Sequence, residues 1–215
     1  MDSLPACRFV SPTSVAMHQD GTVFVLEKGN GRVRIISTDF TTVSSLGAVV
    51  GLQNARRILF TPSYNSFIVV SSAIPSFYGS SDDRLMEVRI SDSFRLKILG
   101  GTPGNSDGVG MAGARFYQPT AMAWTPEGAL LVSQYDGAIR IVNWDTETVM
   151  TLVAPPTPPT AGTQMTFFPV HSTRSLMLMM NRYHQFRSFG IQADARGLNQ
   201  HVRTLRWSIE WQRQR

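Results

Sequence analysis

Hydrophobic and polar residues alternate along this chain in short segments, and a turn that contains glycine or proline separates most of them. Residues 32–36 alternate with a period of about two, which is typical of a strand with one exposed face. Residues 23–26 are apolar without interruption, which indicates a strand buried on both faces. Gly21 ends the turn before that strand, and glycine supplies the positive φ of a hairpin turn. The predicted strands of this first unit are 14–18, 23–26, 32–36 and 41–50.

A second unit of the same kind spans residues 114–153. Its predicted strands are 120–124, 129–133, 138–142 and 148–153. Five positions of the first unit match the second at one constant offset of 107 residues, without a gap, which indicates a duplicated structural unit. The matched pairs are Phe9 and Phe116, Pro12 and Pro119, Val15 and Met122, Ala16 and Ala123, and Gly21 and Gly128.

Two weaker copies complete the pattern, with predicted strands at 58–60, 67–70, 85–90 and 94–99, and at 167–170, 176–180, 186–191 and 202–211. Four-stranded antiparallel units of about 45 residues are typical of a β-propeller. We therefore predict an all-β fold, a β-propeller or propeller segment of about four four-stranded antiparallel blades, in a single domain over residues 1–215. The blades are expected at roughly 6–50, 51–99, 100–154 and 160–215, joined before the last by a proline-rich connector at 155–160. A domain boundary at this connector is the alternative.

The connector before the second unit has the most characteristic sequence. Gly-Asn-Ser-Asp-Gly-Val-Gly at 104–110 is followed by Ala-x-Phe-x-x-Pro at 114–119. Together with Leu-Leu-Val at 130–132 and Ile-Arg-Ile-Val at 139–142, these steps resemble the NHL repeat. The first unit resembles it through Gly21, Asn30, Arg32, Val33 and Arg34. Glu27 and Gln134 stand where the family usually has an aspartate, so the chain is a divergent match.

The resemblance implies a propeller of about six blades, whereas four fit into this chain. The chain is then a fragment, a compact four-bladed form, or an arc completed by additional blades from another chain. The resemblance also makes residues 104–110 a structural connector between blades. Binding of an anion or a metal there, through backbone groups and Asp107, is the alternative.

The positive charge of the chain is concentrated at its C-terminal end. Residues 1–181 contain 13 basic and 13 acidic residues, whereas residues 182–215 contain seven Arg against Asp194 and Glu210, which accounts for the whole net charge of +5. Polar and apolar residues alternate after Thr204, which predicts a strand that closes the last blade, with a helix as the alternative. Arg and Trp together favour binding to a protein or to RNA. The candidate partner-binding residues are Arg182, Arg187, Arg203, Arg206, Trp207 and Trp211.

These observations favour a non-enzymatic binding module or scaffold that assembles with a protein partner. RNA is the alternative partner, and the neutral balance of residues 1–181 disfavours it because phosphate binding needs a positive surface. A propeller enzyme, such as a metal-dependent lyase or hydrolase, is least favoured. The four histidines lack metal-ligand spacing and Cys7 has no base beside it, so we expect no catalytic, metal or cofactor-binding residues. With a single cysteine and no long apolar segment, we expect an intracellular, cytoplasmic protein with no membrane partner.

Overall fold

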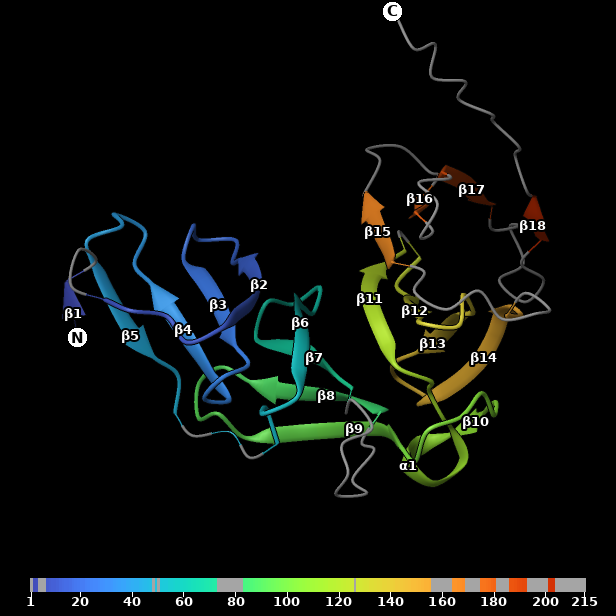
Figure 1. Cartoon of the computed structure of the whole chain (residues 1–215), viewed down its shortest axis with the longest axis horizontal. Helices are drawn as coiled ribbons and strands as arrows, with labels where there is room; N and C mark the ends of the chain where they lie inside the picture. The colour runs from blue at the N-terminus through green and yellow to red at the C-terminus, as the bar shows by residue number, and fades with distance from the viewer. Residues whose placement is uncertain are drawn as a thin grey trace, which may run out of the picture. The chain divides into compact units, whose positions relative to one another are not determined.

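The structure is a computed structural model of the chain. It describes residues 7–47, 49, 51–72, 83–125 and 127–155, and, for the backbone alone, the strands at 2–3, 164–168, 175–180, 186–192 and 201–203. Figure 1 shows the strands grouped into four sheets that follow one another along the chain. Each of the four sheets has four or five strands. The predicted all-β fold of four-stranded antiparallel units is therefore confirmed.

The first sheet has the spatial order β1-β5-β4-β3-β2. Its strands are β1 (Asp2–Ser3), β2 (Pro12–Met17), β3 (Val23–Glu27), β4 (Arg32–Ile36) and β5 (Thr42–Ser45). In the β3–β4 ladder Phe24 lies opposite Ile35; Phe24 belongs to the hydrophobic core, and the partly buried Ile35 packs against it. Gly21 closes the β2–β3 turn with φ +90°, as its position in the sequence predicts.

The second sheet has the order β6-β7-β8-β9 and shares its core with the first. Its strands are β6 (Ala55–Phe60), β7 (Ser66–Ser71), β8 (Asp83–Arg89) and β9 (Arg95–Gly101). Phe24 of the first sheet meets Phe60 edge-on, with ring centroids 5.0 Å apart, and Phe67 packs in the same cluster. The Ser14 hydroxyl accepts a hydrogen bond from the Ile58 backbone N–H at 3.3 Å. Apolar packing and hydrogen bonds thus join these two sheets.

The third sheet has the order β10-β14-β13-β12-β11, and the fourth has the order β15-β16-β17-β18. The third contains β10 (Gly108–Val109), β11 (Pro119–Trp124), β12 (Leu130–Gln134), β13 (Ile139–Asn143) and β14 (Thr148–Val153), and the short helix α1 (Gly110–Gly113) follows β10. The fourth contains β15 (Gln164–Phe168), β16 (Ser175–Met180), β17 (Phe186–Gln192) and β18 (His201–Arg203). The chain divides into two compact units, residues 1–120 and 121–215. The first unit holds the whole of the first two sheets.

One expectation about element boundaries was wrong. The strand predicted at 41–50 is shorter and ends at Ser45, where the chain leaves the sheet and Gly47 follows. The connector predicted at 104–110 contains β10 and the first residue of α1. For the strand predicted at 202–211, β18 ends at Arg203 and residues 204–215 lie outside the described residues.

Candidate functional site

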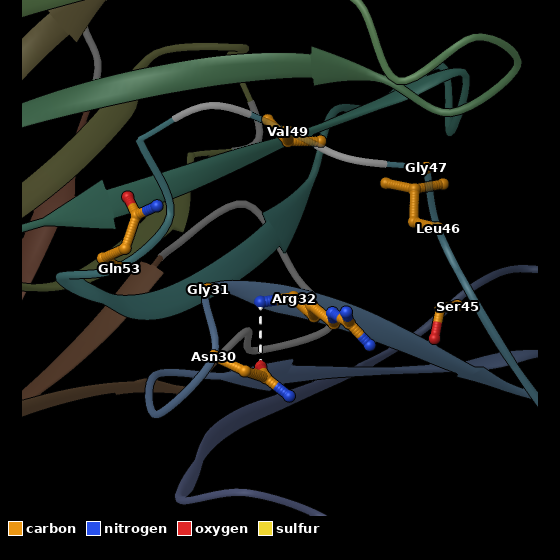
Figure 2. Close-up of a pocket in the computed structure, with 8 residues that line it drawn as sticks. All are labelled: Asn30, Gly31, Arg32, Ser45, Leu46, Gly47, Val49 and Gln53. Carbon is orange, nitrogen blue, oxygen red and sulfur yellow. Dashed lines mark hydrogen bonds between the residues drawn. The ribbon is translucent and has the colours of Figure 1, made fainter.

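A cavity of about 400 Å³ opens in the first unit, beside the turn between β3 and β4. One wall is this turn with the start of β4, and the other is the linker from β5 to β6. Figure 2 shows the lining residues around an open space, with Gln53 on one side and Ser45 on the other. We call it the Arg32 pocket, lined by Asn30, Gly31, Arg32, Ser45, Leu46, Gly47, Val49 and Gln53.

Glu27 fixes the turn that forms the first wall. It is fully buried at the end of β3, where its Oε1 accepts a hydrogen bond from the Val10 backbone N–H at 2.8 Å. Its Oε2 accepts one from Asn30 Nδ2 at 2.7 Å. Asn30 Oδ1 in turn accepts a hydrogen bond from the Arg32 backbone N–H at 3.1 Å, drawn as the dashed line in Figure 2. A buried carboxylate and one amide side chain therefore set the path of the backbone up to Arg32.

Gly31 allows the two walls to approach each other. Its φ of +64° lies in the left-handed region, which glycine adopts most readily. A Cβ added at Gly31 would lie 3.2 Å from the Gln53 backbone nitrogen, closer than an ordinary contact. Glycine is thus required both by the turn and by the neighbouring linker.

Arg32 supplies the free charge of the pocket. Its side chain is exposed, and within the described residues its guanidinium has no hydrogen bond and no ion pair. Glu27 is its direct partner in the β3–β4 ladder, but the two Glu27 oxygens accept hydrogen bonds from Val10 and Asn30. In Figure 2 the Arg32 side chain extends across the base of the pocket towards Ser45. A guanidinium in this setting is available to a ligand.

The other lining groups suit a ligand with a negatively charged end and an apolar body. Gln53 and Ser45 are exposed and add an amide and a hydroxyl, neither with a hydrogen-bond partner among the described side chains. Leu46 and the buried Val49 provide apolar surface. Because guanidinium presents a planar fork of N–H donors, carboxylate and phosphate are the groups that fit it best.

The arginine at the centre of the third strand of each of the two matching units has a structural role instead. Arg34 donates from Nη2 to Cys7 Sγ at 3.2 Å and lies over the Phe9 ring at 5.7 Å, so it holds the N-terminal segment to β4. Its counterpart Arg140 is fully buried and donates to Gln134 Oε1 at 3.4 Å. Glu27 and Gln134, the two departures from the NHL pattern, are therefore both buried hydrogen-bonding groups.

The six residues that the sequence proposed for partner binding are not tested. Arg187 lies in β17 and Arg203 in β18, with their side chains outside the described residues. Arg182, Arg206, Trp207 and Trp211 lie outside them altogether. Sequence reasoning missed the Arg32 pocket, although it noted Asn30 and Arg32 as repeat positions. The pocket forms because the linker from β5 to β6 lies beside the β3–β4 turn, and no local sequence pattern reveals this contact.

Within the part of the chain that the structure describes, no three His, Cys, Asp or Glu side chains gather closely enough to hold a metal ion. No helix in that part is long and apolar enough to cross a membrane.

Comparisons with known proteins identify the fold. No family model and no curated protein matches the sequence. Among solved structures, an auxiliary nutrient binding protein from Bacteroides thetaiotaomicron VPI-5482 aligns with 90% of this chain and 42% of its own, at 13% identity and a TM-score of 0.60. A chain of a nidogen/laminin complex aligns with 89% of this chain and 64% of its own, at 14% identity and a TM-score of 0.59.

A third similar structure is virginiamycin B lyase from Staphylococcus aureus, at 10% identity and a TM-score of 0.54, covering 91% of this chain and 60% of that one. This chain thus spans about two fifths to two thirds of the proteins it resembles. All three are β-propeller-like proteins. The four antiparallel sheets and these neighbours together show that the chain has a β-propeller type of fold.

Proposed function

We propose that the chain is a non-enzymatic binding module that assembles with a protein partner through the turns and linkers at the ends of its blades. We also propose that it is a divergent, intracellular member of the NHL propellers. The observation that carries the binding function is the exposed guanidinium of Arg32, which has no hydrogen bond and no ion pair within the described residues. It lies at a pocket whose first wall is fixed by two part-buried hydrogen bonds of Glu27.

The partner group that fits this pocket best is a carboxylate of an acidic or C-terminal residue. Arg32 forms paired hydrogen bonds with the carboxylate, Gln53 and Ser45 add weaker polar contacts, and Leu46 and Val49 receive the neighbouring apolar side chain. A nucleic acid would need several cations along its backbone. The Arg32 pocket offers one, and residues 1–181 carry equal numbers of positive and negative charges.

Arg32→Gln tests the proposal, with Arg95→Gln as the matched control because Arg95 is an exposed arginine on β9 whose guanidinium has no hydrogen bond and no ion pair among the described residues. The probes are synthetic peptides with a free C-terminal carboxylate or internal Glu, and their amidated or Gln counterparts, measured by fluorescence anisotropy. We expect Arg32→Gln to weaken binding of the acidic peptides by about tenfold or more, the effect of losing a charged hydrogen bond. Arg95→Gln should leave the affinity unchanged.

Equal affinity of Arg32→Gln and the unchanged protein for every acidic peptide would contradict the proposal. Single-stranded RNA, added as a competitor of the peptides, tests the alternative that the partner is RNA. Binding of RNA with a steep salt dependence, and of no peptide, would favour the RNA alternative.

A further inference from the structure

A second and larger cavity, of about 700 Å³, opens in the same unit at the opposite ends of the strands. The Arg32 pocket follows the end of β3, whereas this cavity includes His18, which precedes the start of β3. Its other walls are the β6–β7 turn and the β8–β9 hairpin. The volume lies in the range of typical small-ligand sites, about 300 to 1,000 Å³. We call it the Tyr64 cavity.

Charges in the Tyr64 cavity are compensated in pairs, in contrast with the free guanidinium of Arg32. The two permanently charged side chains that line it each have a neighbour of opposite charge: Arg89 Nη1 lies 3.0 Å from Asp92 Oδ2, and Glu87 lies directly opposite Lys97 in the β8–β9 ladder. His18 Nδ1 lies 2.8 Å from Asp20 Oδ1. An ionic ligand would therefore have to compete with an existing pair. The site favours an uncharged ligand.

The polar groups that remain available are neutral. The Tyr64 hydroxyl, the Asn65 amide and the Ser91 hydroxyl make no side-chain hydrogen bond within the described residues. Asn65 and Ser91 are exposed to solvent. Together these groups offer both hydrogen-bond donors and hydrogen-bond acceptors. A ligand hydroxyl needs both, since it donates one hydrogen bond and accepts others.

A buried carboxylate lines the cavity and is held in place. Glu87 is 9% exposed, and its Oε1 accepts a hydrogen bond of 2.5 Å from the hydroxyl of Ser66, which is 4% exposed. The Thr61 hydroxyl lies 3.0 Å from the Ser66 hydroxyl and fixes its position. A carboxylate oriented in this way accepts hydrogen bonds from ligand hydroxyls without moving.

Tyr64 also provides a fixed aromatic surface. Its ring packs edge-on against His18, with centroids 5.4 Å apart, and lies tilted by 32° against Phe60, with centroids 5.7 Å apart. Its backbone φ of +58° places it in the left-handed region at the tip of the β6–β7 turn, where a non-glycine residue is uncommon. Leu96, 41% exposed, adds apolar surface to the lining. Aromatic and aliphatic surface beside hydroxyl-binding groups suits the C–H face of a sugar ring.

We propose that the Tyr64 cavity binds an uncharged, polyhydroxylated ligand, a short carbohydrate. Hydroxyls of the ligand donate to Glu87 and exchange hydrogen bonds with Asn65, Ser91 and the Tyr64 hydroxyl, while the ring lies against Tyr64 and Leu96. The ligand is either a free saccharide or a neutral glycan attached to a protein, and the chemistry of recognition is the same for both. This site is independent of the Arg32 pocket.

The test uses the whole chain on a glycan array, with neutral, sialylated and sulfated glycans, and titration calorimetry with free neutral mono- and oligosaccharides. The variants are Asn65→Ala and Tyr64→Phe, which remove polar groups from exposed or half-buried side chains. Glu87→Gln keeps the shape of the carboxylate and removes its charge. Arg32→Gln is the control at the other pocket, and thermal melting verifies that each variant is folded.

We expect neutral saccharides to bind, Asn65→Ala and Glu87→Gln each to weaken binding at least about fivefold, and Tyr64→Phe to weaken it less because the ring is retained. Binding of array glycans but of no free saccharide would assign the ligand to glycoproteins. The proposal is overturned if no neutral saccharide binds in either format, if only anionic glycans bind, or if Arg32→Gln removes binding that a folded Asn65→Ala variant retains.

Discussion

At the scale of single residues, a buried carboxylate organises the Arg32 pocket. Glu27 is fully buried, and its two oxygens accept hydrogen bonds from Val10 and Asn30. The sequence marks Glu27 as a departure from the NHL pattern, but it does not reveal these partners. Val10 is 17 positions away, and only the folded chain brings its N–H to the end of β3.

Replacing Glu27 by Ala should therefore destabilise the protein by about 2–4 kcal/mol, because two part-buried donors lose their acceptor and the removal of a fully buried side chain leaves a cavity. Urea unfolding measures this change. Glu127→Ala is the matched control: Glu127 is exposed in the β11–β12 turn, and a surface change of this kind should stay within about 0.5 kcal/mol. Equal effects of the two substitutions would show that the Glu27 hydrogen bonds do not support the fold.

Gly128 is a residue whose conformation the sequence did predict. It matches Gly21, the turn glycine for which the sequence predicts positive φ, and its own φ is +85°. No atom lies within 4 Å of a Cβ built there, so a substitution would suffer from backbone strain and not from a clash. Gly128→Val should then destabilise the protein by about 1–3 kcal/mol. Gly128→Asn, which tolerates this conformation better, should cost less, and the order of the two melting temperatures tests the cause.

At the scale of elements, the turns of the first sheet are stabilised by aspartates. In the β2–β3 turn the Thr22 backbone N–H donates to Asp20 Oδ1 at 2.8 Å, and His18 lies on the other side. These contacts, Thr22 first, lower the pKa of Asp20 from 3.8 to about 2. In the β4–β5 turn the Ser37 hydroxyl, followed by the Thr41 backbone, lowers the pKa of Asp39 as well. Each carboxylate is thus more acidic in the folded chain than in the unfolded chain.

The sign of the resulting pH dependence follows from this difference. A lowered pKa in the folded state contributes stability above the pKa of the unfolded chain, near 4, and the contribution is lost as the pH falls through about 2. Asp20→Asn should be less stable than the unchanged protein at pH 7 and should approach it in stability at pH 2. Denaturant unfolding across this range measures the difference. If the stability difference between Asp20→Asn and the unchanged protein is the same at pH 7 and at pH 2, the assignment is contradicted. For Asp39→Asn we expect the stability difference to shrink towards low pH in the same way.

Hairpin-connected strands were predictable because their signals are local. The period of two in 32–36 and the glycine turns identified β3, β4, β12 and β13 to within a residue or two. The end of β5 at Ser45 and the helix α1 were not predicted, since each depends on where the chain must leave one sheet to reach another. The same limit applies to the Arg32 pocket and the Tyr64 cavity, whose walls come from separate strands and turns.

At the scale of the whole molecule, the sequence repeat led to the β-propeller fold, which the structure and its neighbours confirm. The chain spans 42% to 64% of the similar chains described above. The sequence leaves three alternatives open: a fragment, a compact four-bladed form, and an arc completed by blades from another chain. The last of these can be tested on the first sheet. The partner-binding role of Arg182, Arg187, Arg203, Arg206, Trp207 and Trp211 stays a prediction.

Val15 and Met17 of β2 provide a test of such completion. They are 64% and 68% exposed, whereas Ala16 between them packs against the core that the first two sheets share. Apolar side chains on this free face of β2 are expected to be covered by an added blade, and burying one such side chain contributes about 1.5–3 kcal/mol.

The double change Val15→Thr and Met17→Gln should therefore weaken association by about tenfold or more, measured by sedimentation equilibrium over a range of concentrations. Met150→Gln, at a 54% exposed methionine on β14, is the control and should leave association unchanged. A chain that stays monomeric at every concentration, with or without these changes, would contradict completion by a second copy and leave blades of a different chain as the partner to be sought.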